Sequence, residues 1–497
     1  MSAARPLPFR KVLIANRGEI ACRILRTLRA SGLASVAIHH AVEADSPHAR
    51  MADEAIEIFG DTPVAAHLDG DAIIAAARRV GADAVHPGYG FLSENASFAA
   101  AVEKAGLAFI GPDARTIALM GDKISARDFA RAQGVPVAPS ITPSSGGEAF
   151  LAQAETIGFP LIIKAAAGGG GKGMSVVRAP AQLREAARIA ASEAQRYFGD
   201  GRIYAETYVE QPRHIEVQIV GDGEGDALHL HERECSVQRR FQKIIEEAPA
   251  PNLDPGLRAD ICAAAVRLAA AARYRNLGTV EFILGSDGRF FFLEMNTRLQ
   301  VEHPVTEEIT GLDLVRLQLE IAAGFGLGEV ARPAPGRGHA IECRICAEDP
   351  ERDFLPETGT LAVLQAPCAP YLRFENALRR GQKITGDFDP LLAKLVVHGA
   401  DRAEAIDRAV AALGELALLG VKTNIDYLAR LINHPAFRSG DLHTDFINQH
   451  AAELGAQPPD APTTDAAAIA AALGFRGFRN AVFDVPEPYA SIGGWRN

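Results

Sequence analysis

Polar and apolar side chains alternate in the stretch EMNTRLQVEH, directly after the apolar run FFFL. The polar residues at every second position are Glu294, Asn296, Arg298, Gln300 and Glu302. In an extended chain, alternate side chains share one face, so these five groups would all lie on one side. Their types fit two kinds of chemistry, the binding of a divalent cation and the binding of a small oxyanion.

The acids at the start of this stretch belong to a predicted β-hairpin, TVEFILGSDGRFFFLEMN, in which two apolar strands flank a Gly/Asp turn. A loop of two or four residues pairs position 281 with 292, which makes Glu281 and Glu294 diagonal neighbours roughly 7–8 Å apart. Two carboxylates this close repel unless a cation or proton intervenes, and their oxygens suit Mg²⁺ or Mn²⁺. Asn296 can add a third oxygen. A pair of acids on a solvated sheet face is the alternative, which the surrounding Phe and Leu residues disfavour.

The other three polar residues must lie elsewhere, because an extended chain from 294 to 302 covers roughly 26 Å. We therefore predict that the backbone leaves the strand soon after Asn296, and that Arg298, Gln300 and Glu302 form a separate pocket. A guanidinium beside an amide suits a small planar oxyanion, and a nearby carboxylate can act on that anion's proton. This combination indicates a small acid that must lose a proton, such as bicarbonate. A surface ion pair is the alternative that these residues leave open.

A glycine-rich segment, AAAGGGGKGM, surrounds Lys172. Successive glycines let backbone N–H groups wrap a polyphosphate, although Lys172 is followed by Gly and the loop is therefore not a Walker A motif. A strand, glycine loop and second strand form a candidate lid over ATP phosphates, with a plain linker as the alternative. Lys164, at the end of the apolar strand LIIK, is a candidate phosphate ligand, whereas Lys123 in GDK fits an ordinary helix start equally well.

A charged run, HLHERECSVQRRFQKIIEEAP, follows later in the chain. Lys243 in this run is a candidate second cation for an anionic substrate, and a solvated charge run is the alternative. His229 and His231 alternate with leucine, which predicts strand side chains rather than zinc ligands. Six cysteines are scattered through the chain, and the Cys343–Cys346 CxxC lies in an alternating stretch, so a strand is favoured over a metal site or a disulfide framework.

Composition excludes several classes of protein. The formal net charge of −11 gives no basic footprint for nucleic acid. A hydrophobic fraction of 48% and a charged fraction of 23% are ordinary for a soluble globular protein. The N-terminal stretch MSAARPLPFR has no apolar signal region, and no uncharged apolar run is long enough for a membrane helix. We therefore expect no membrane span and a cytoplasmic location.

Several elements must position these side chains, and 497 residues are too many for one core. KVLIA followed by EIACRILRTLRASG predicts a buried strand, a turn and an amphipathic helix, and the alternation continues through helices near 69–80 and 95–105. This pattern predicts a doubly wound α/β domain to about residue 118. Its first turn, NRGE, is not GxGxxG, so a dinucleotide site is poorly supported. A β-rich unit, a long Ala-rich helix and a strand-rich section follow.

Together, ten ordered motifs resemble the biotin carboxylase family of ATP-grasp ligases over about residues 9–450. They are KVLIANRGEIACRI, HPGYGFLSEN, MGDK, IIKAAAGGGGKGM, PRHIEVQI, ERECSVQRRFQKIIEEAP, EMNTRLQVEHPVTE, GHAIECRICAEDP, GDFDPLLAKL and GVKTNIDYL. The section after the last of these, and the tail FDVPEPYASIGGWRN, are most similar to the α subunits of bacterial acyl-CoA carboxylases.

The resemblance implies a multidomain α/β and α+β fold. The expected parts are a doubly wound N-terminal domain at 9–118, a helical linker at 119–135, an ATP-grasp lid with a mobile glycine loop at 136–209, an ATP-grasp catalytic subdomain at 210–335, a β-rich biotin carboxylase C-terminal domain at 336–450, and a linker and tail at 451–497.

The same resemblance implies that ATP activates bicarbonate as carboxyphosphate and that the carboxyl then passes to N1′ of biotin on a carrier protein. ATP is expected at Lys123, Lys164, Gly170, Gly171, His214 and the hinge formed by Glu206, Thr207, Tyr208 and Val209. Mg²⁺ or Mn²⁺, at one or two sites, is expected at Glu281, Glu294 and Asn296. Bicarbonate is expected at Lys243, Arg298, Gln300 and Val301, with Glu302 as its base. Biotin is expected near Tyr89, Asp389 and Arg344, the last of which would stabilise its enolate.

Two residues depart from the family pattern. Phe241 stands where the family has a histidine near the nucleotide's ribose, and a phenyl ring cannot make that hydrogen bond. Thr207 occupies a hinge position where many relatives carry lysine. We predict that nucleotide binding survives both changes, because the lysines, metal ligands and hinge remain.

No AMKM-like biotin attachment motif is present, so we expect the biotin on a separate carrier, or a truncated chain. The expected partners are a biotin carboxyl carrier protein, a carboxyltransferase subunit and a second copy of this chain. Two alternative functions stay open at this point. One is the equivalent component of a pyruvate or other 2-oxoacid carboxylase, and the other is a catalytically silent binding subunit.

Overall fold

The structure, a computed structural model, describes residues 6–141, 147–166, 174–330, 335–456, 465 and 469. It divides into two units, Met1–Leu454 and Gly455–Asn497, and the description below concerns the first. The predictions for Gly170, Gly171 and Lys172, and for most of the tail, lie outside the described residues.

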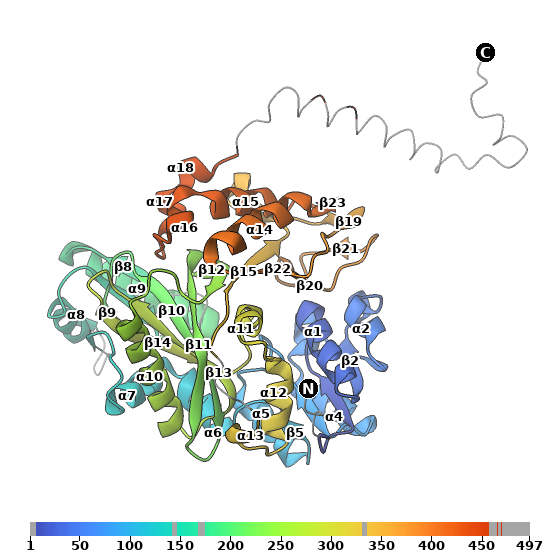
Figure 1. Cartoon of the computed structure of the whole chain (residues 1–497). Helices are drawn as coiled ribbons and strands as arrows, with labels where there is room; N and C mark the ends of the chain where they lie inside the picture. The colour runs from blue at the N-terminus through green and yellow to red at the C-terminus, as the bar shows by residue number, and fades with distance from the viewer. Residues whose placement is uncertain are drawn as a thin grey trace, which may run out of the picture. The chain divides into compact units, whose positions relative to one another are not determined.

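The N-terminal part is built on a five-stranded parallel sheet in the order β3-β2-β1-β4-β5. Figure 1 shows this part in blue, with β2 and β5 labelled. The strand order reverses beside β1, as in a doubly wound fold, which confirms the predicted fold class. Its strands are β1 Lys11–Ile14, β2 Ala34–His39, β3 Glu54–Glu57, β4 Ala84–His86 and β5 Ala108–Phe109. Its helices are α1 Gly18–Ala30, η1 Ala41–Glu43, α2 Pro47–Met51, α3 Pro63–His67, α4 Gly70–Arg79 and α5 Ala96–Lys104.

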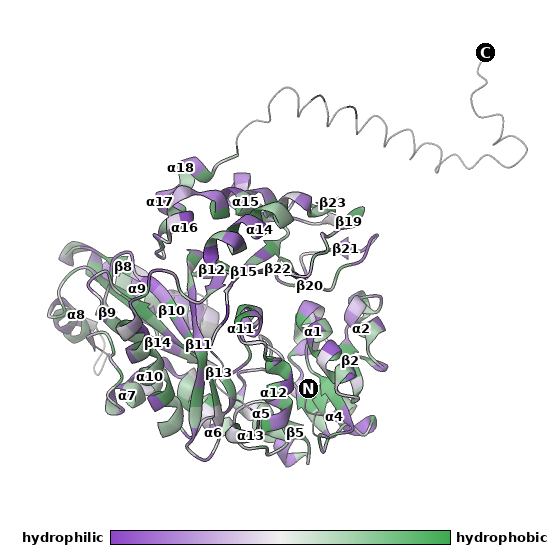
Figure 2. Cartoon of the chain, in the orientation of Figure 1, coloured by the Kyte–Doolittle hydropathy of each residue, from purple (hydrophilic) through white to green (hydrophobic). Residues whose placement is uncertain are grey.

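Local sequence explains these elements. The helices α4 and α5 each begin at a side-chain cap, since Asp69 accepts a hydrogen bond from the N–H of Ala72 and Asn95 accepts one from Phe98. Both lie near the predicted positions. The parallel strands are continuous apolar runs covered by helices on both faces, and Figure 2 shows the region around β2 in the green of hydrophobic residues.

A second, smaller sheet follows the helices α6 Ala114–Gly121 and α7 Lys123–Ala132. It is antiparallel, in the order β6-β9-β7-β8. The strands are β6 Ser140–Ile141, β7 Leu161–Ala165, β8 Ser175–Val177 and β9 Ile203–Thr207. Two helices that the sequence patterns did not predict, α8 Gly147–Glu155 and α9 Pro180–Phe198, pack on this sheet through Phe150 and Leu183.

The largest sheet has eight strands in the order β14-β13-β10-β11-β12-β15-β22-β20. These are β10 Arg213–Asp222, β11 Ala227–Arg239, β12 Gln242–Ala248, β13 Arg275–Leu284, β14 Phe290–Asn296, β15 His339–Cys346, β20 Leu372–Asn376 and β22 Leu391–Gly399. Hydrogen bonding between β12 and β15 makes the sheet continuous across the boundary predicted near residue 335. His229, His231, Cys343 and Cys346 lie on strands of this sheet, as predicted, and all six cysteines are free.

Several helices pack against the eight-stranded sheet or against each other. They are α10 Pro255–Ala271, α11 His303–Thr310, α12 Leu314–Ala322 and α13 Leu327–Val330, followed towards the C-terminus by α14 Arg402–Glu415, α15 Ile425–Asn433, α16 Pro435–Ser439, α17 Phe446–Gln449 and α18 Ala451–Leu454. Short elements lie between them: β16 Glu348–Asp349, η2 Pro350–Arg352, β17 Leu355–Pro356, β18 Gly359–Thr360, β19 Val363–Gln365, β21 Lys383–Ile384 and β23 Ala417–Leu419. Helix α14 packs against β22 and α15 (Figure 1).

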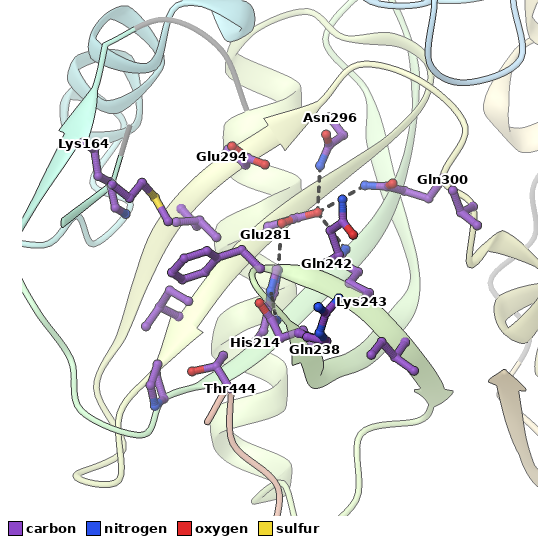
Figure 3. Close-up of a pocket in the computed structure, with 18 of the residues that line it drawn as sticks. Lys164, His214, Gln238, Gln242, Lys243, Glu281, Glu294, Asn296, Gln300 and Thr444 are labelled. Carbon is purple, nitrogen blue, oxygen red and sulfur yellow. Dashed lines mark hydrogen bonds and ion pairs between the residues drawn. The ribbon is translucent and has the colours of Figure 1, made fainter. Parts of the chain in front are cut away.

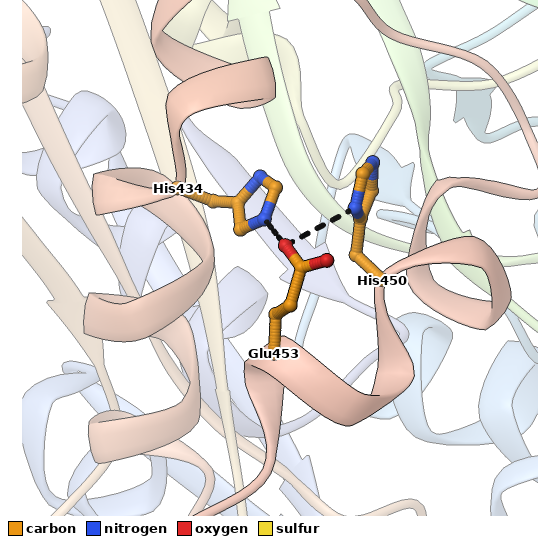
Figure 4. Close-up of side chains that lie close together, drawn as sticks. All are labelled: His434, His450 and Glu453. Carbon is orange, nitrogen blue, oxygen red and sulfur yellow. Dashed lines mark hydrogen bonds and ion pairs between the residues drawn. The ribbon is translucent and has the colours of Figure 1, made fainter.

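Two histidine side chains contact α18, the last helix of this unit. Nε2 of His434 lies 2.5 Å from Oε2 of Glu453, and Nδ1 of His450 lies 3.6 Å from the same oxygen (Figure 4). The Nδ1 atom of His434 accepts a hydrogen bond from the N–H of Ala436 and so caps α16. The contact therefore links α18 to the start of α16.

Within the part of the chain that the structure describes, no helix has the length and apolar character needed to cross a membrane.

Candidate active site

A cavity of about 560 Å³ is lined by all three regions of the fold. Tyr89 comes from the N-terminal part, Lys164 and Glu206 from the small sheet, and Glu281 and Arg344 from the large sheet. Every predicted site residue within the described ranges except Glu302 is among the lining residues. Glu302 is fully buried behind this wall, where it bonds to Lys243 and Arg344.

The hairpin at the floor of the cavity has a different register from the predicted one. Phe282 pairs with Phe292, but Glu281 pairs directly with Glu294, so the prediction of a diagonal acid pair was wrong. The register shifts between these two pairs, which leaves Leu293 as the extra residue of a β-bulge. The bulge has a clear consequence: Phe292 turns into the core with Phe282, while Glu294 joins Glu281 on the cavity side. Without the bulge, strand alternation would put Phe292 and Glu294 on one face.

Glu281 is the centre of a hydrogen-bond network (Figure 3). Its Oε1 accepts from Nζ of Lys243 at 2.9 Å, from Nδ2 of Asn296 at 2.8 Å and from Nε2 of Gln300 at 3.2 Å. Its Oε2 lies 2.7 Å from Nε2 of His214. Burial alone raises the pKa of Glu281, but Lys243 and His214 outweigh burial and lower it well below its usual range. The carboxylate is therefore ionised.

The strand β14 ends at Asn296, and α11 begins at His303 with Glu302 at its N-cap. The predicted departure from the strand after Asn296 is confirmed. The predicted separation of two pockets is not, because Nη2 of Arg298 donates to Oδ1 of Asn296 at 3.1 Å and Nη1 to Oε1 of Gln300 at 2.7 Å. Since both of those amides also bond to Glu281, the acidic end and the arginine end form one continuous network.

Glu302 is fully buried between two cations. Its Oε1 accepts from Nζ of Lys243 at 2.6 Å and its Oε2 from Nη2 of Arg344 at 3.0 Å. Burial raises the pKa of this carboxyl, but Lys243, Arg344 and Arg233 together lower it well below the ordinary value. Lys243 and Arg344 are thus held toward this acid.

The lysines predicted to meet ATP also face acids. Nζ of Lys123, the first residue of α7, lies 3.3 Å from Oε2 of Glu294, so this lysine both starts a helix and faces the cavity. Lys164 pairs with Glu206 at the end of β9, and Arg127 pairs with the other oxygen of the same carboxylate. The remaining hinge residues Thr207, Tyr208 and Val209 line the same cavity.

Three further predicted residues border the cavity from other sides. The hydroxyl of Tyr89 donates to Glu19, the carbonyl of Val301 accepts from Nζ of Lys394 at 2.7 Å, and Oδ1 of Asp389 accepts from the N–H of Leu391 at 3.0 Å. Phe241 sits in the β11–β12 turn with φ of 64° and leaves 52% of its surface exposed beside the cavity. Its ring offers surface rather than a hydrogen bond.

The donor set of Glu281, Glu294 and Asn296 fits a hard divalent cation. Two directly opposed carboxylates and one amide, all bordering the cavity, supply oxygen ligands of the kind that Mg²⁺ and Mn²⁺ prefer. Glu294 keeps a third of its side chain exposed, which leaves it accessible from the cavity.

Several residues that shape the site were missed from the sequence. Glu94 accepts from Nε of Arg298 at 2.8 Å and from the N–H of Thr297 at 3.0 Å, and so holds the turn after β14. Arg233 is fully buried and bonds to Glu216 at 2.5 Å. One signal was available for Glu216: His214, Glu216 and Gln218 alternate with apolar residues along β10, the same pattern that drew attention to the stretch after β14.

Comparisons with known proteins agree with this geometry. Residues 8–117 match the family described as "Biotin carboxylase, N-terminal domain", residues 122–330 match "Carbamoyl-phosphate synthase L chain, ATP binding domain", and residues 342–449 match "Biotin carboxylase C-terminal domain". The biotin carboxylase of Halalkalibacterium halodurans is 49% identical over 444 residues, which cover 89% of this chain and 98% of that one.

Longer proteins match as well. The α subunit of mitochondrial methylcrotonoyl-CoA carboxylase from Mus musculus is 47% identical over 446 residues, and the match covers 89% of this chain but 62% of that subunit. A solved structure of the biotin carboxylase domain dimer of Hydrogenobacter thermophilus 2-oxoglutarate carboxylase, in complex with MgADP, ADP and bicarbonate, has a TM-score of 0.88 and 41% identity and covers 90% of this chain and 99% of that one. The chain belongs to the biotin carboxylase family of ATP-dependent ligases.

Proposed function

We propose that this protein carboxylates biotin on a carrier protein, with ATP and bicarbonate, as the biotin carboxylase component of an acyl-CoA carboxylase. The observation that carries the proposal is the continuous network that joins the opposed acids Glu281 and Glu294 to Arg298, Lys243 and Glu302 around one cavity. The joining of a nucleotide phosphate to bicarbonate requires a cation site beside an anion site, and this network supports such an arrangement.

We assign Mg²⁺ or Mn²⁺ to Glu281, Glu294 and Asn296, where it would offset the charge of the ATP phosphates. Lys123 and Lys164 line the same cavity and would bind the same phosphates. His214 and the hinge from Glu206 to Val209 complete the nucleotide side. Isothermal titration should show ATP binding at millimolar Mg²⁺ despite Phe241, and the absence of binding would contradict these assignments.

On the bicarbonate side, Arg298 and Gln300 would hold the planar anion and Glu302 would take its proton. Bicarbonate oxygen then attacks the γ-phosphorus, ADP leaves, and carboxyphosphate forms. With Lys243 and Arg344 bonded to it, Glu302 is a weak base. Bicarbonate and phosphate draw those cations away from the carboxylate, which raises the basicity of Glu302 when substrate is present. Arg344 is then free to stabilise the enolate of biotin, next to Tyr89 and Asp389.

Bicarbonate-dependent ATP hydrolysis, stimulated by free biotin, tests the proposal. The activity should be lost in Arg298→Ala and in Glu302→Gln. Arg184→Ala, which removes an exposed ion pair between α9 and α8, is a suitable control and should keep it. Hydrolysis that ignores biotin or bicarbonate would overturn the assignment.

The chain spans 62% of the length of the mouse α subunit. We therefore propose that the remaining components of the carboxylase lie on other polypeptides or domains. A biotin carboxyl carrier protein and a carboxyltransferase should co-purify with the protein and be identified by mass spectrometry. We further propose a homodimer, which analytical ultracentrifugation checks, and a cytoplasmic location, which the six free cysteines support and cell fractionation checks.

A further inference from the structure

Two acids on neighbouring strands of the large sheet lie directly opposite each other. Glu246 on β12 and Glu342 on β15 are directly paired in the antiparallel register, so their side chains share one sheet face. Both are fully buried. Among the described residues, neither oxygen of Glu342 has a hydrogen-bond partner, and Oε2 of Glu246 also lacks one.

Arg344 connects this pair to the proposed reaction site. It lies two residues after Glu342 on the same strand, and therefore on the same face. Its Nε donates to Oε1 of Glu246 at 2.6 Å, while its Nη2 donates to Oε2 of Glu302 at 3.0 Å. One guanidinium thus bridges the buried acids and the proposed base.

The number of positive charges near Glu246 and Glu342 decides whether both acids can be ionised. Arg344 supplies one positive charge to three carboxyl groups, Glu246, Glu302 and Glu342, and Lys243 supplies a second through Glu302. Lys394 also attracts Glu342 electrostatically, but its own bonds are to the carbonyl of Val301 and to Glu19. Two ionised carboxylates opposed in a buried ladder would repel strongly, because no water screens them.

We propose that Glu342 is a neutral carboxylic acid opposite the ionised Glu246, and that this acid pair positions Arg344 between the sheet and Glu302. The second half of the proposal rests on the proposed function, since it concerns the arginine that would face biotin. With one proton on Glu342 the pair carries a single negative charge, which Arg344 matches. With both acids ionised, the pair would draw the guanidinium into the sheet and away from the cavity.

The electrostatics of each acid agree with this state. Burial raises the pKa of Glu342 well above its ordinary value, with Lys394 opposing burial and Glu246 reinforcing it. Burial raises the pKa of Glu246 to about 7, with Arg344 opposing. Helix α11 packs against β12 and β15, and Glu302 at its N-cap raises the pKa of both acids further by its negative charge.

Infrared spectroscopy tests the proton without turnover. At pH 7 the wild-type protein should show a carboxylic-acid C=O band that shifts in D₂O and is absent in Glu342→Gln. Glu247→Gln is a matched control, because Glu247 is the next residue to Glu246 and equally buried but is bonded to His339 and Arg402. That substitution should leave the band in place. A wild-type spectrum without the band, or a band that survives Glu342→Gln, would overturn the proposed proton.

Kinetics test the positioning. Glutamine keeps a neutral donor, so kcat of Glu342→Gln at pH 7 should stay within about threefold of wild type, and its alkaline limb should move to higher pH. Leucine removes the donor, and Glu342→Leu should lower kcat about tenfold with little change in the KM for ATP. Equal kcat values and pH profiles in all three proteins would overturn the positioning role. Wild-type protein without bicarbonate-dependent ATP hydrolysis would contradict the proposed function, whereas the infrared result would still decide the proton.

Discussion

The N-terminal sheet and the eight-stranded sheet bury different chemistry. In the first, the strands bury apolar residues such as Leu13, Ile38 and Val85 on faces that helices cover. In the second, Arg233 and Lys394 are just as completely buried, and each is held by hydrogen bonds to acids or carbonyls. Burying apolar area stabilises a fold, whereas burying a charge costs free energy unless its partners are in place. Both sheets bury apolar cores that support the fold, and the eight-stranded sheet in addition holds buried charges beside the cavity.

The largest effect should come from the reacting end of the charged sheet. Glu302→Gln removes the proposed base while keeping its shape, and bicarbonate-dependent ATP hydrolysis should fall about 1,000-fold, within the range for loss of a positioned general base. Steady-state kinetics measure the loss, and isothermal titration should show that ATP still binds. Activity within tenfold of wild type would assign the proton transfer to another group.

The second-largest effect is the loss of stability when a buried ion pair of the large sheet is broken. Arg233→Met leaves Glu216 buried beside Lys243 alone, and breaking such a pair should lower the free energy of unfolding by about 3–5 kcal/mol. Urea denaturation followed by circular dichroism gives this value. Arg184→Met, on an exposed pair with Glu148, should leave the midpoint unchanged. Equal midpoints for Arg233→Met and wild type would remove the distinction between the sheets.

Buried glutamates should give opposite pH dependences in the two regions. Glu43, in the N-terminal part, is held by His67 and Arg17, which outweigh burial and lower its pKa to about 2. A lowered folded-state pKa stabilises above the unfolded value of about 4.3 and is lost as pH falls toward 2, a loss of about 3 kcal/mol. Glu342 has a raised pKa, so its contribution is most favourable below the unfolded value and is lost as pH rises.

Unfolding of the variants across pH 2–9 checks both signs. Glu43→Gln should flatten the acid limb of the stability curve, and Glu342→Gln should increase stability at alkaline pH relative to wild type. The same slope change in both variants would contradict the contrast between the regions.

The smallest effect concerns the apolar sheet. Ile38→Val removes one methylene group from a fully buried position on β2 and should cost about 1 kcal/mol of stability. The kcat for ATP hydrolysis should not change, because the residue contacts none of the cavity. A lowered kcat in this variant would show that the two sheets are coupled more closely than their contacts indicate.

The sequence allowed some of this geometry to be predicted, for identifiable reasons. The end of β14 at Asn296 follows from the reach of an extended chain, and the doubly wound N-terminal part follows from apolar periodicity. The hairpin register could not be predicted, because turn residues fix the strands but not the bulge at Leu293. The bulge forms because Phe292 packs into the hydrophobic core, and this packing depends on the tertiary structure rather than on the local sequence.

Long-range partners were beyond the sequence patterns. Glu94 meets Arg298 across 204 positions of the chain, and no local periodicity reports such a contact. Glu342 was hidden for another reason: alternation predicts that its side chain shares a face with Arg344, but not which strand lies opposite. The charge of a buried acid depends on that neighbour.

The ladder between β12 and β15 joins segments that lie about ninety positions apart, with Ile245 opposite Cys343 and Ala248 opposite Ala340. Two separately made fragments, one ending before β15 and one beginning there, would each expose a strand edge with unpaired backbone amides and with the buried acids Glu246 or Glu342. Neither fragment can therefore be exchanged for an unrelated domain without leaving this edge unpaired. Mixing the two fragments gives a complementation assay, in which recovered ligase activity reports that β12 and β15 have paired.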